Sequence, residues 1–219
     1  MSRIINEKFT CTNCHVESDF KMYKSVNVSL DPELKDKVIS GEIFKWTCPN
    51  CGETLYIHYD LLYHDMENEF MIYYSPNNCE QLNKDVANSC RNLKGMQRKI
   101  YRTVDSMNRL IEKINILEEG LNDIAIEFGK LMLKVDKNNE IPNDCDLYFE
   151  RCITVKGEDT KQLLFRLFKE EKLQKEMVVI QSDAYNNYLD YVSKDNRFAL
   201  HSLCDTINEK WIMNKFKSM

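Results

Sequence analysis

The chain has 219 residues and a formal net charge of −5, and 43% of its residues are hydrophobic. With six Gly and four Pro, its composition is typical of a folded protein and excludes a low-complexity or linker-dominated chain. No stretch approaches the roughly 18 uninterrupted apolar residues of a membrane span, and the N-terminus lacks the apolar core of a signal peptide. We therefore expect a cytoplasmic protein without a membrane partner, whose nine cysteines stay reduced.

The first segment, residues 1–80, is expected to be rich in strands. Its short alternating or aromatic runs are separated by turn residues, and they cover residues 20–28, 43–47, 54–59 and 70–74. One short helix is expected at 31–41, with Asp31 as its N-cap and Pro32 at the first helical position. Gly41 stands where such a helix ends.

From about Asn83 to Val135 the hydrophobic pattern changes to that of helices. Apolar residues at alternating steps of three and four form a seam with a second row beside it. These residues are Ile100, Val104, Met107, Leu110, Ile111, Ile114, Leu117, Leu121, Ile124, Ala125, Phe128, Leu131 and Met132. Gly120 is expected to end or bend the first of two helices. Because the seam is too wide for an isolated coiled coil, the helices should pack on another part of the protein or on a partner.

After a polar loop at 136–144, three β-prone runs at 147–155, 161–168 and 177–180 predict an antiparallel meander. Helices are expected at 183–192 and around 198–216. The expected fold class is α+β: a β-rich N-terminal part with one inserted helix, central helices, and a C-terminal antiparallel β-meander with helices. The expected division of the chain is 1–80, 81–136 and 137–219.

Four cysteines form two pairs with the same spacing, Cys11 with Cys14 and Cys48 with Cys51. A two-residue spacing lets both sulfurs of a tight turn face one cation, and a structural zinc ion takes four such donors. Pro49 and Gly52 suit a knuckle turn in the second pair. The pattern predicts one structural Zn²⁺ per chain in an N-terminal zinc ribbon. Iron in a rubredoxin-like site and metal-free redox pairs remain alternatives.

Other residues that could ligate a metal carry a weaker signal. His15 follows Cys14 directly and is an alternative ligand, although four thiolates already complete a tetrahedral set. His58 lies in an aromatic run and is expected to be an ordinary surface or hydrogen-bonded histidine. Five cysteines have no close partner along the chain and are expected to be small apolar or surface residues: Cys79, Cys90, Cys145, Cys152 and Cys204.

The block from Cys11 to Pro76 resembles the CpXC domain, named for its paired Cys-Pro-x-Cys motifs. Besides the two cysteine pairs, the resemblance rests on Val26-Asn-Val-Ser-Leu-Asp-Pro-Glu-Leu, Ile39-Ser-Gly-Glu-Ile-Phe and Leu61-Leu-Tyr-His-Asp-Met. The stretch from Glu112 to Lys130 is similar to the region that follows in longer members. The resemblance implies a zinc-ribbon domain of bacterial or archaeal proteins without an established activity. The first pair here, Cys-Thr-Asn-Cys, lacks the proline, which shapes the turn but does not ligate.

The element Tyr63-His64-Asp65 is the other recurrent feature of that resemblance. It has two interpretations, a catalytic His64–Asp65 pair or a structural hydrogen-bonded turn. We favour the structural one because no nucleophile or open metal position stands near it in the sequence.

Three functions are compatible with the sequence. We favour a non-enzymatic protein-interaction or scaffold module, held together by the metal, with an unidentified protein partner or a second copy of the chain. A nucleic-acid-associated regulatory protein is the alternative, since residues 84–113 carry eight basic and three acidic side chains with Tyr101 among them. An enzyme is the third and least favoured, because four thiolates leave no coordination position to activate water.

Overall fold

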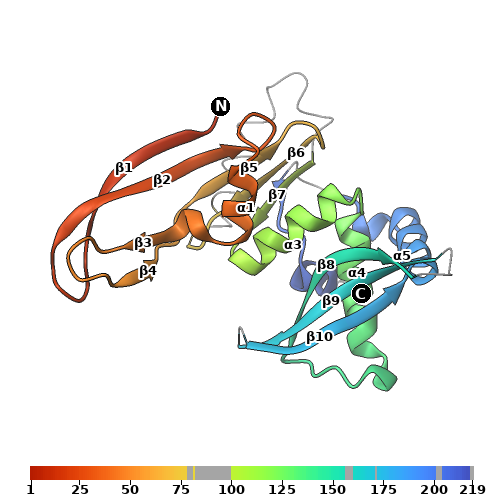
Figure 1. Ribbon diagram of the computed structural model, residues 1–219. Coiled ribbons are helices and arrows are strands. Elements are labelled where there is room, and N and C mark those ends of the chain that lie inside the picture. The colour runs from red at the N-terminus through yellow and green to blue at the C-terminus, as the bar shows by residue number, and fades with distance from the viewer. Residues whose placement is uncertain (78–80, 82–99, 156–159, 171, 201–203, 218–219) are drawn as a thin grey trace. The chain divides into compact units, whose positions relative to one another are not determined.

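The computed structural model (Figure 1) describes residues 1–77, 81, 100–155, 160–170, 172–200 and 204–217. The chain forms two compact units, Met1–Ile111 and Glu112–Met219, and the division falls inside helix α3 (Met107–Glu118). The predicted central segment 81–136 therefore contributes to both units. None of the described helices is long and apolar enough to cross a membrane.

A mixed sheet forms the centre of the first unit (Figure 1). Its strands there are β1 (Arg3–Thr10), β2 (Glu17–Asn27), β5 (Leu61–Asp65), β6 (Phe70–Tyr74) and β7 (Ile100–Val104), in the order β1-β2-β5-β6-β7. The pairs β1–β2 and β5–β6 are antiparallel, whereas β2–β5 and β6–β7 are parallel. The parallel pairing of β2 with β5 needs a long connection, and this connection carries the second cysteine pair.

The connection from β2 to β5 contains helix α1 (Leu34–Ile39), the 3₁₀ turn η1 (Glu42–Phe44) and the hairpin of β3 (Lys45–Thr47) and β4 (Thr54–Tyr56). The predicted end of the helix is confirmed, since Gly41 has a left-handed φ of 74°. The predicted start at Asp31 is wrong, because the helix begins at Leu34. The Asp31 carboxylate instead accepts a hydrogen bond from the Ser2 N–H at 2.9 Å, and so it ties down the N-terminus.

The prediction that Ile100 and Val104 belong to a helix is also wrong, because both lie in β7. Tyr101 to Val104 are buried at four consecutive positions, so both faces of this strand are covered. Parallel strands that are buried on both faces lose the period of two that identifies half-exposed strands. A short apolar run of this kind cannot be told from a helix by its periodicity alone.

The second unit contains most of the remaining helices and a separate sheet. After Gly120 (φ 66°) come α4 (Asp123–Val135), η3 (Lys137–Asn139), β8 (Asp146–Thr154), β9 (Lys161–Lys169), β10 (Lys172–Gln181), α5 (Ser182–Lys194), η4 (Asn196–Phe198), β11 (Cys204–Asp205) and α6 (Glu209–Lys217). The predicted meander is confirmed by the antiparallel order β10-β9-β8. The third strand is longer than the predicted run 177–180, because β10 already begins at Lys172. The terminal helix is shorter than predicted, because it begins only at Glu209.

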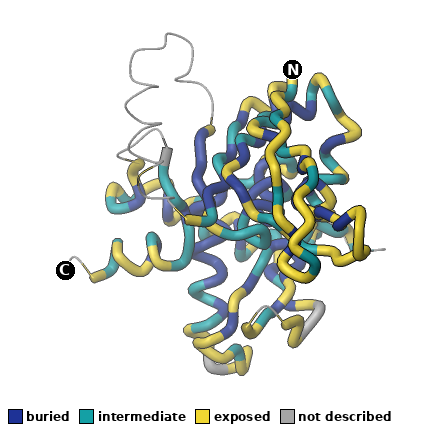
Figure 2. The backbone as a smooth tube through the Cα atoms, turned by 90° about the vertical axis from the view of Figure 1, so that its left-hand side faces the viewer, coloured by how far each residue is buried: buried dark blue, intermediate teal, exposed yellow. Residues whose placement is uncertain are grey.

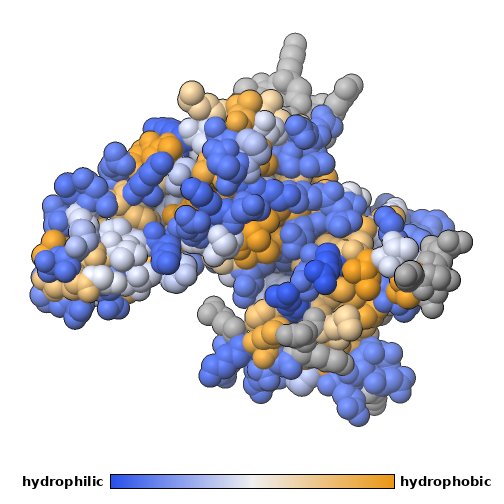
Figure 3. Space-filling model, viewed as in Figure 1, coloured by the Kyte–Doolittle hydropathy of each residue, from blue (hydrophilic) through white to orange (hydrophobic). Residues whose placement is uncertain are grey.

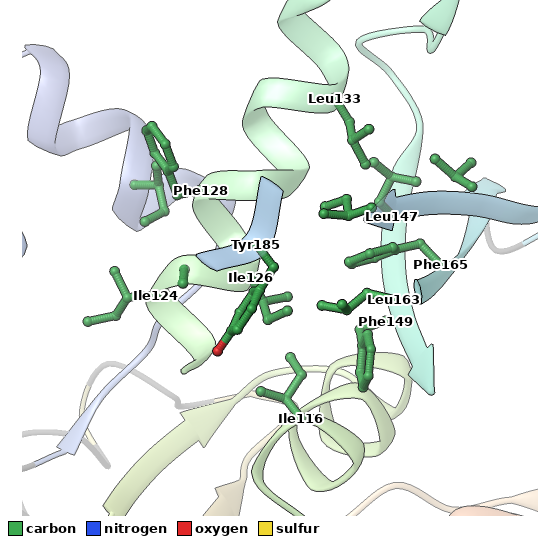
Figure 4. Packing of buried hydrophobic residues seen from close by; sticks show 14 of the residues in the cluster. Ile116, Ile124, Ile126, Phe128, Leu133, Leu147, Phe149, Leu163, Phe165 and Tyr185 are labelled. Carbon is green, nitrogen blue, oxygen red and sulfur yellow. The ribbon is translucent and has the colours of Figure 1, made fainter. Parts of the chain in front are cut away.

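Helix α4 lies at the centre of the second unit. Its eight residues from Asp123 to Lys130 are all buried, and α4 is accordingly dark blue over this stretch in Figure 2. Ile126 and Leu133 face the strand residues Leu147 and Phe165 in one apolar cluster (Figure 4). The part of the predicted seam that lies in α4 is therefore buried or half-buried within the unit, against its sheet and helices. The observed class is α+β, as predicted.

Candidate metal centre

The two cysteine pairs lie at the ends of two hairpins of the first unit. Cys11 and Cys14 stand between β1 and β2, and Cys48 and Cys51 stand between β3 and β4. In Figure 1 both hairpins extend in the same direction and their ends lie together. Thus 34 positions of sequence separate Cys14 from Cys48, but the fold brings the two knuckles into contact.

The two knuckles have the same backbone hydrogen bonds. The N–H of Cys11 donates to Val16 O at 3.0 Å, and the N–H of Cys48 donates to Glu53 O at 2.8 Å. In each knuckle a second bond, 3.0 Å long, returns to the carbonyl of the first cysteine from the residue after the second cysteine. Each cysteine pair is therefore held by a turn of the same design.

The residue after the second cysteine has a left-handed backbone in both knuckles. It is His15 in the first, with φ 59°, and Gly52 in the second, with φ 74°. This conformation costs little for glycine but is unfavourable for other L-residues. The position of His15 thus has a backbone role in the turn, and the four sulfurs come together without its imidazole as a ligand.

The four sulfur atoms lie within 4.8 Å of one another. Cys11 Sγ is 3.6 Å from Cys51 Sγ, and Cys14 Sγ is 3.6 Å from Cys48 Sγ. These separations are far longer than the roughly 2.0 Å of a disulfide bond. The predicted ligand set is thus brought together as four free thiols that can hold one metal ion.

The knuckles differ in the environment of their sulfurs. Cys11 and Cys48 are 0% and 2% exposed, whereas Cys14 is half-buried and Cys51 is exposed. A hydrogen bond from the Asn50 side chain and one from the Val16 backbone lower the pKa of the Cys14 thiol to about 6. A hydrogen bond from the Glu53 backbone favours the Cys51 thiolate, but partial loss of hydration and hydrogen bonds with the three neighbouring thiols prevail and raise the pKa of Cys51 to about 11. Four thiols this close together do not all lose their protons unless a positive charge compensates the thiolates. A bound metal ion supplies that charge.

Aromatic contacts hold the two hairpins together behind the knuckles. The rings of Phe9 in β1 and Trp46 in β3 meet edge to face, with centroids 4.8 Å apart. Further from the knuckles, the Tyr59 hydroxyl donates to Ile43 O at 2.9 Å and accepts from the N–H of Tyr23 at 3.2 Å. Burial raises the pKa of Tyr59 to about 12, so this hydroxyl keeps its proton. The sequence reasoning did not find these supports, since each joins residues far apart in the chain.

The structure also places the other predicted residues. Cys145 is buried and Cys152 is half-buried, and among the described residues no further group of metal-binding side chains includes them. Cys79 and Cys90 lie outside the described residues, as does the side chain of Cys204. His58 is exposed, and its Nδ1 lies 2.9 Å from the Tyr74 hydroxyl.

His64 and Asp65 are neighbours in β5, so their side chains point to opposite faces of the sheet. The buried Asp65 carboxylate accepts from the N–H groups of Glu67 and Asn68, each at 3.0 Å, and from Asn68 Nδ2 at 2.7 Å. These bonds close the turn between β5 and β6. The geometry supports the structural interpretation of this pair rather than a catalytic one.

The described part of the basic segment 84–113 does not form an exposed basic stripe. Arg102 is 5% exposed and donates to Tyr101 O at 2.8 Å, and the Tyr101 ring is fully buried. Lys113 is 1% exposed, and Arg109 pairs with Asp105 at 2.7 Å. The remaining basic residues of the segment lie outside the described residues: Lys84, Arg91, Lys94, Arg98 and Lys99.

The fold and the site together define a module in which two Cys-x-x-Cys hairpin ends face each other around a position for one metal ion. The family model of the CpXC protein matches residues 9–130, which is more than half of the chain and includes both knuckles. The chain therefore belongs to the CpXC family. No curated protein and no solved structure matches it.

Proposed function

We propose that this protein is a non-enzymatic, zinc-stabilised interaction module of the cytoplasm. The observation that supports the structural metal is the arrangement of four free thiols within 4.8 Å of one another. In a tetrahedral site with Zn–S bonds of about 2.3 Å, neighbouring sulfurs are about 3.8 Å apart. The separations of 3.6 Å between Cys11 and Cys51 and between Cys14 and Cys48 match that value.

Four sulfur donors are enough to complete a tetrahedral coordination shell, and this supports a structural role for the metal. A catalytic zinc ion keeps one position for water or substrate, but here that position is taken by the fourth thiolate. Zinc is preferred over iron because the proposed role needs no change of oxidation state. A reducing cytoplasm keeps the ligands as thiols until the metal binds.

Metal quantification combined with native mass spectrometry tests this site. The wild-type chain should carry one zinc ion, whereas Cys51→Ser and Cys48→Ser should carry none. Cys51 is the sharper test, because its exposed side chain can be replaced without opening a cavity. Cys152→Ser, in the second unit, is the matched control and should keep the zinc. Zinc retained by Cys51→Ser, or a wild-type chain that binds no metal, contradicts the proposal.

For the interaction surface we propose the outer side of β1, the first strand in the sheet order. The N–H of Tyr23 donates to the Tyr59 hydroxyl, so the facing pair Ile4 and Tyr23 is not joined by ladder bonds. The backbone groups of Ile4, Asn6 and Lys8 consequently point away from β2. Such an outer side is a template for pairing with another strand.

A second copy of the same strand fits this side. With two β1 strands antiparallel and Ile5 at the dyad, Arg3 of each copy stands opposite Glu7 of the other. Arg3 and Glu7 are both exposed. Lys8, the residue type that usually protects an edge, is engaged by Asp19 at 2.8 Å. Opposite charges in facing positions stabilise such a pair.

A charge swap tests this homodimer by its mass in dilution series. Arg3→Glu should raise the dimer dissociation constant by up to about thirtyfold, since two facing pairs each change by up to about 1 kcal/mol. Arg3→Glu combined with Glu7→Arg should restore it. Lys21→Glu, on the neighbouring strand, is the control. A monomeric wild-type chain, or a dimer unaffected by Arg3→Glu, contradicts the proposed β1 interface. Neither result bears on the zinc site, which the metal analysis tests separately.

A further inference from the structure

Five charged side chains of the second unit are almost completely buried. Glu112, Lys113, Asp123, Glu127 and Lys130 are between 1% and 5% exposed, and we call them the buried charge cluster. The first two belong to α3 and the other three to α4. Charged residues at this depth need partners, because burial removes their hydration.

Lys130 is the centre of one half of the cluster. Its Nζ lies 3.0 and 3.2 Å from the two carboxylate oxygens of Glu112 and 2.9 Å from Glu127 Oε1. Glu112 Oε1 also accepts from the Phe149 N–H of β8 at 2.8 Å. The Tyr148 ring of the same strand lies 5.9 Å from Lys130 Nζ. One ammonium group thus joins two carboxyl groups.

Lys113 is the centre of the other half. Its Nζ donates to Asp123 Oδ2 and to the carbonyl of Ile207, each at 3.0 Å. Glu127 Oε1 lies 4.0 Å away, so Glu127 stands between the two lysines. The hydroxyl of Tyr185 in α5 accepts a hydrogen bond from the N–H of Asn122, which precedes Asp123. Burial raises the pKa of Tyr185, which is therefore neutral.

The charges within the cluster do not balance. Three carboxylates face two ammonium groups, which leaves one negative charge in excess when all five are ionised. Glu127 Oε2 is buried and, within the described chain, has no hydrogen-bond partner. An excess buried charge is neutralised by taking up a proton more readily than it is tolerated.

The proton is expected on one of the two carboxyl groups that contact Lys130, those of Glu112 and Glu127. Burial raises the pKa of Glu112; the charge of Lys130 opposes this, and that of Glu127 adds to it. Burial acts against the Lys130 ammonium, but Glu112 and Glu127 outweigh it, so the pKa of Lys130 is raised and it stays charged. The proton therefore belongs to the carboxyl pair and not to a lysine.

We propose that the buried charge cluster binds one proton at neutral pH, shared by the Glu112–Glu127 pair, and that this proton stabilises the packing of α3, α4 and β8. With it the cluster is electrically neutral, and Lys113 and Lys130 each retain a carboxylate partner. Without it, one uncompensated negative charge lies inside the unit. The unit is then a proton-dependent structure, independent of the metal site.

The sign of the pH dependence follows from the folded state binding the proton more tightly than the unfolded chain. The stabilisation is complete below the pKa of a glutamate in the unfolded chain, and it is lost as the pH rises to the pKa of the protonated carboxyl group in the folded protein. Between the pKa of an unfolded-chain glutamate, about 4.3, and the raised pKa in the folded protein, this one site should raise the unfolding constant by about tenfold for each pH unit. Above the folded-state pKa the site adds no further pH dependence.

Glu127→Gln tests the proposal, because it removes the excess charge and keeps the shape of the side chain. The infrared spectrum of the wild-type protein near neutral pH should show the carbonyl stretch of a protonated carboxyl group, and Glu127→Gln should lack it. Denaturant unfolding at a series of pH values between about 5 and 7 should lose the tenfold dependence in this variant. Glu140→Gln, at an exposed position, is the control and should retain both signals.

Glu112→Gln is a second variant that should also lose the protonated carboxyl band. It should unfold more readily than Glu127→Gln, because both Glu112 oxygens accept charge-assisted bonds and the Phe149 N–H depends on one of them. A wild-type protein without the band, or a Glu127→Gln variant with an unchanged pH dependence, overturns the proposal.

Discussion

Strand β1 and strand β9 differ sharply in how they are held. Six of the eight residues of β1 are exposed and none is buried, whereas four of the nine residues of β9 are buried. The surface over the hairpins of β1 to β4, at left in Figure 3, is mainly hydrophilic with small hydrophobic spots. Burial of apolar surface thus stabilises β9, but it offers little to the far end of β1.

The difference shows what the cysteines contribute. At the hairpin ends, apolar burial is confined to a few residues such as Trp46 and the two buried cysteines. A metal ion can replace a core there because its binding free energy is folding free energy. In the second unit a buried apolar cluster of α4, β8, β9 and β10 supplies the burial that the hairpin ends lack. The two regions should therefore respond to different perturbations.

Metal removal should have the largest effect, and it should be local. Structural zinc sites contribute on the order of 10 kcal/mol. Treatment of the zinc-loaded protein with a chelator should raise amide hydrogen exchange in residues 3–20 and 45–56 and leave α4 and β9 protected. Exchange followed by mass spectrometry measures this. Equal loss of protection in β9 would show that the second unit also depends on the metal.

Truncation in the apolar core should produce the opposite pattern. Phe165 is 0% exposed to solvent, and the centroid of its ring lies 5.6 Å from that of Phe149. Phe165→Ala should cost about 3–5 kcal/mol, through lost burial and the cavity. Denaturant unfolding measures the cost, and metal analysis should still find one zinc ion. Phe168→Ala, on the same strand but half-buried, should cost clearly less.

The sequence predicted the features that depend on local chemistry. The spacing of Cys11, Cys14, Cys48 and Cys51 identified the four sulfurs that the fold brings together. The left-handed conformations of Gly41 and Gly120 ended helices where expected. The C-terminal meander and β6 followed from runs of β-prone residues. Each of these signals lies within a few residues of the element that it specifies.

Features that depend on distant neighbours were missed. Strand β1 was not predicted, because Arg3–Thr10 has mixed charged and apolar residues without a regular alternation. Strand β7 was assigned to a helix because its two buried faces hide the period of two. Glu127 and Lys130 are three positions apart on a helix, where a charged pair is usually solvated. The burial of this face of α4 follows from tertiary contacts: Lys130 bonds Glu127, and the Phe149 N–H of β8 bonds Glu112, the other partner of Lys130.

Loss of the β5–β6 turn carboxylate should have an intermediate effect. Asp65→Ala removes an acceptor for three hydrogen bonds and leaves the N–H groups of Glu67 and Asn68 without it. We expect a loss of about 2–3 kcal/mol, since bonds to a charged group are stronger than neutral ones. Asp60→Ala, at an exposed position with one bond to Ser75, is the matched control. A cost no greater than that of the control would contradict the assigned turn role.

The smallest effect tests the likeness of the two knuckles. His15 and Gly52 occupy the same left-handed position, with φ 59° and 74°. His15→Gly should stabilise the zinc-loaded protein by up to about 1 kcal/mol, while Gly52→Ala should destabilise it by about 1 kcal/mol. Thermal unfolding gives both values, and metal analysis should find zinc in each variant. If His15→Gly instead lost the metal, the imidazole would be a ligand, and the likeness of the knuckles would end at their backbone.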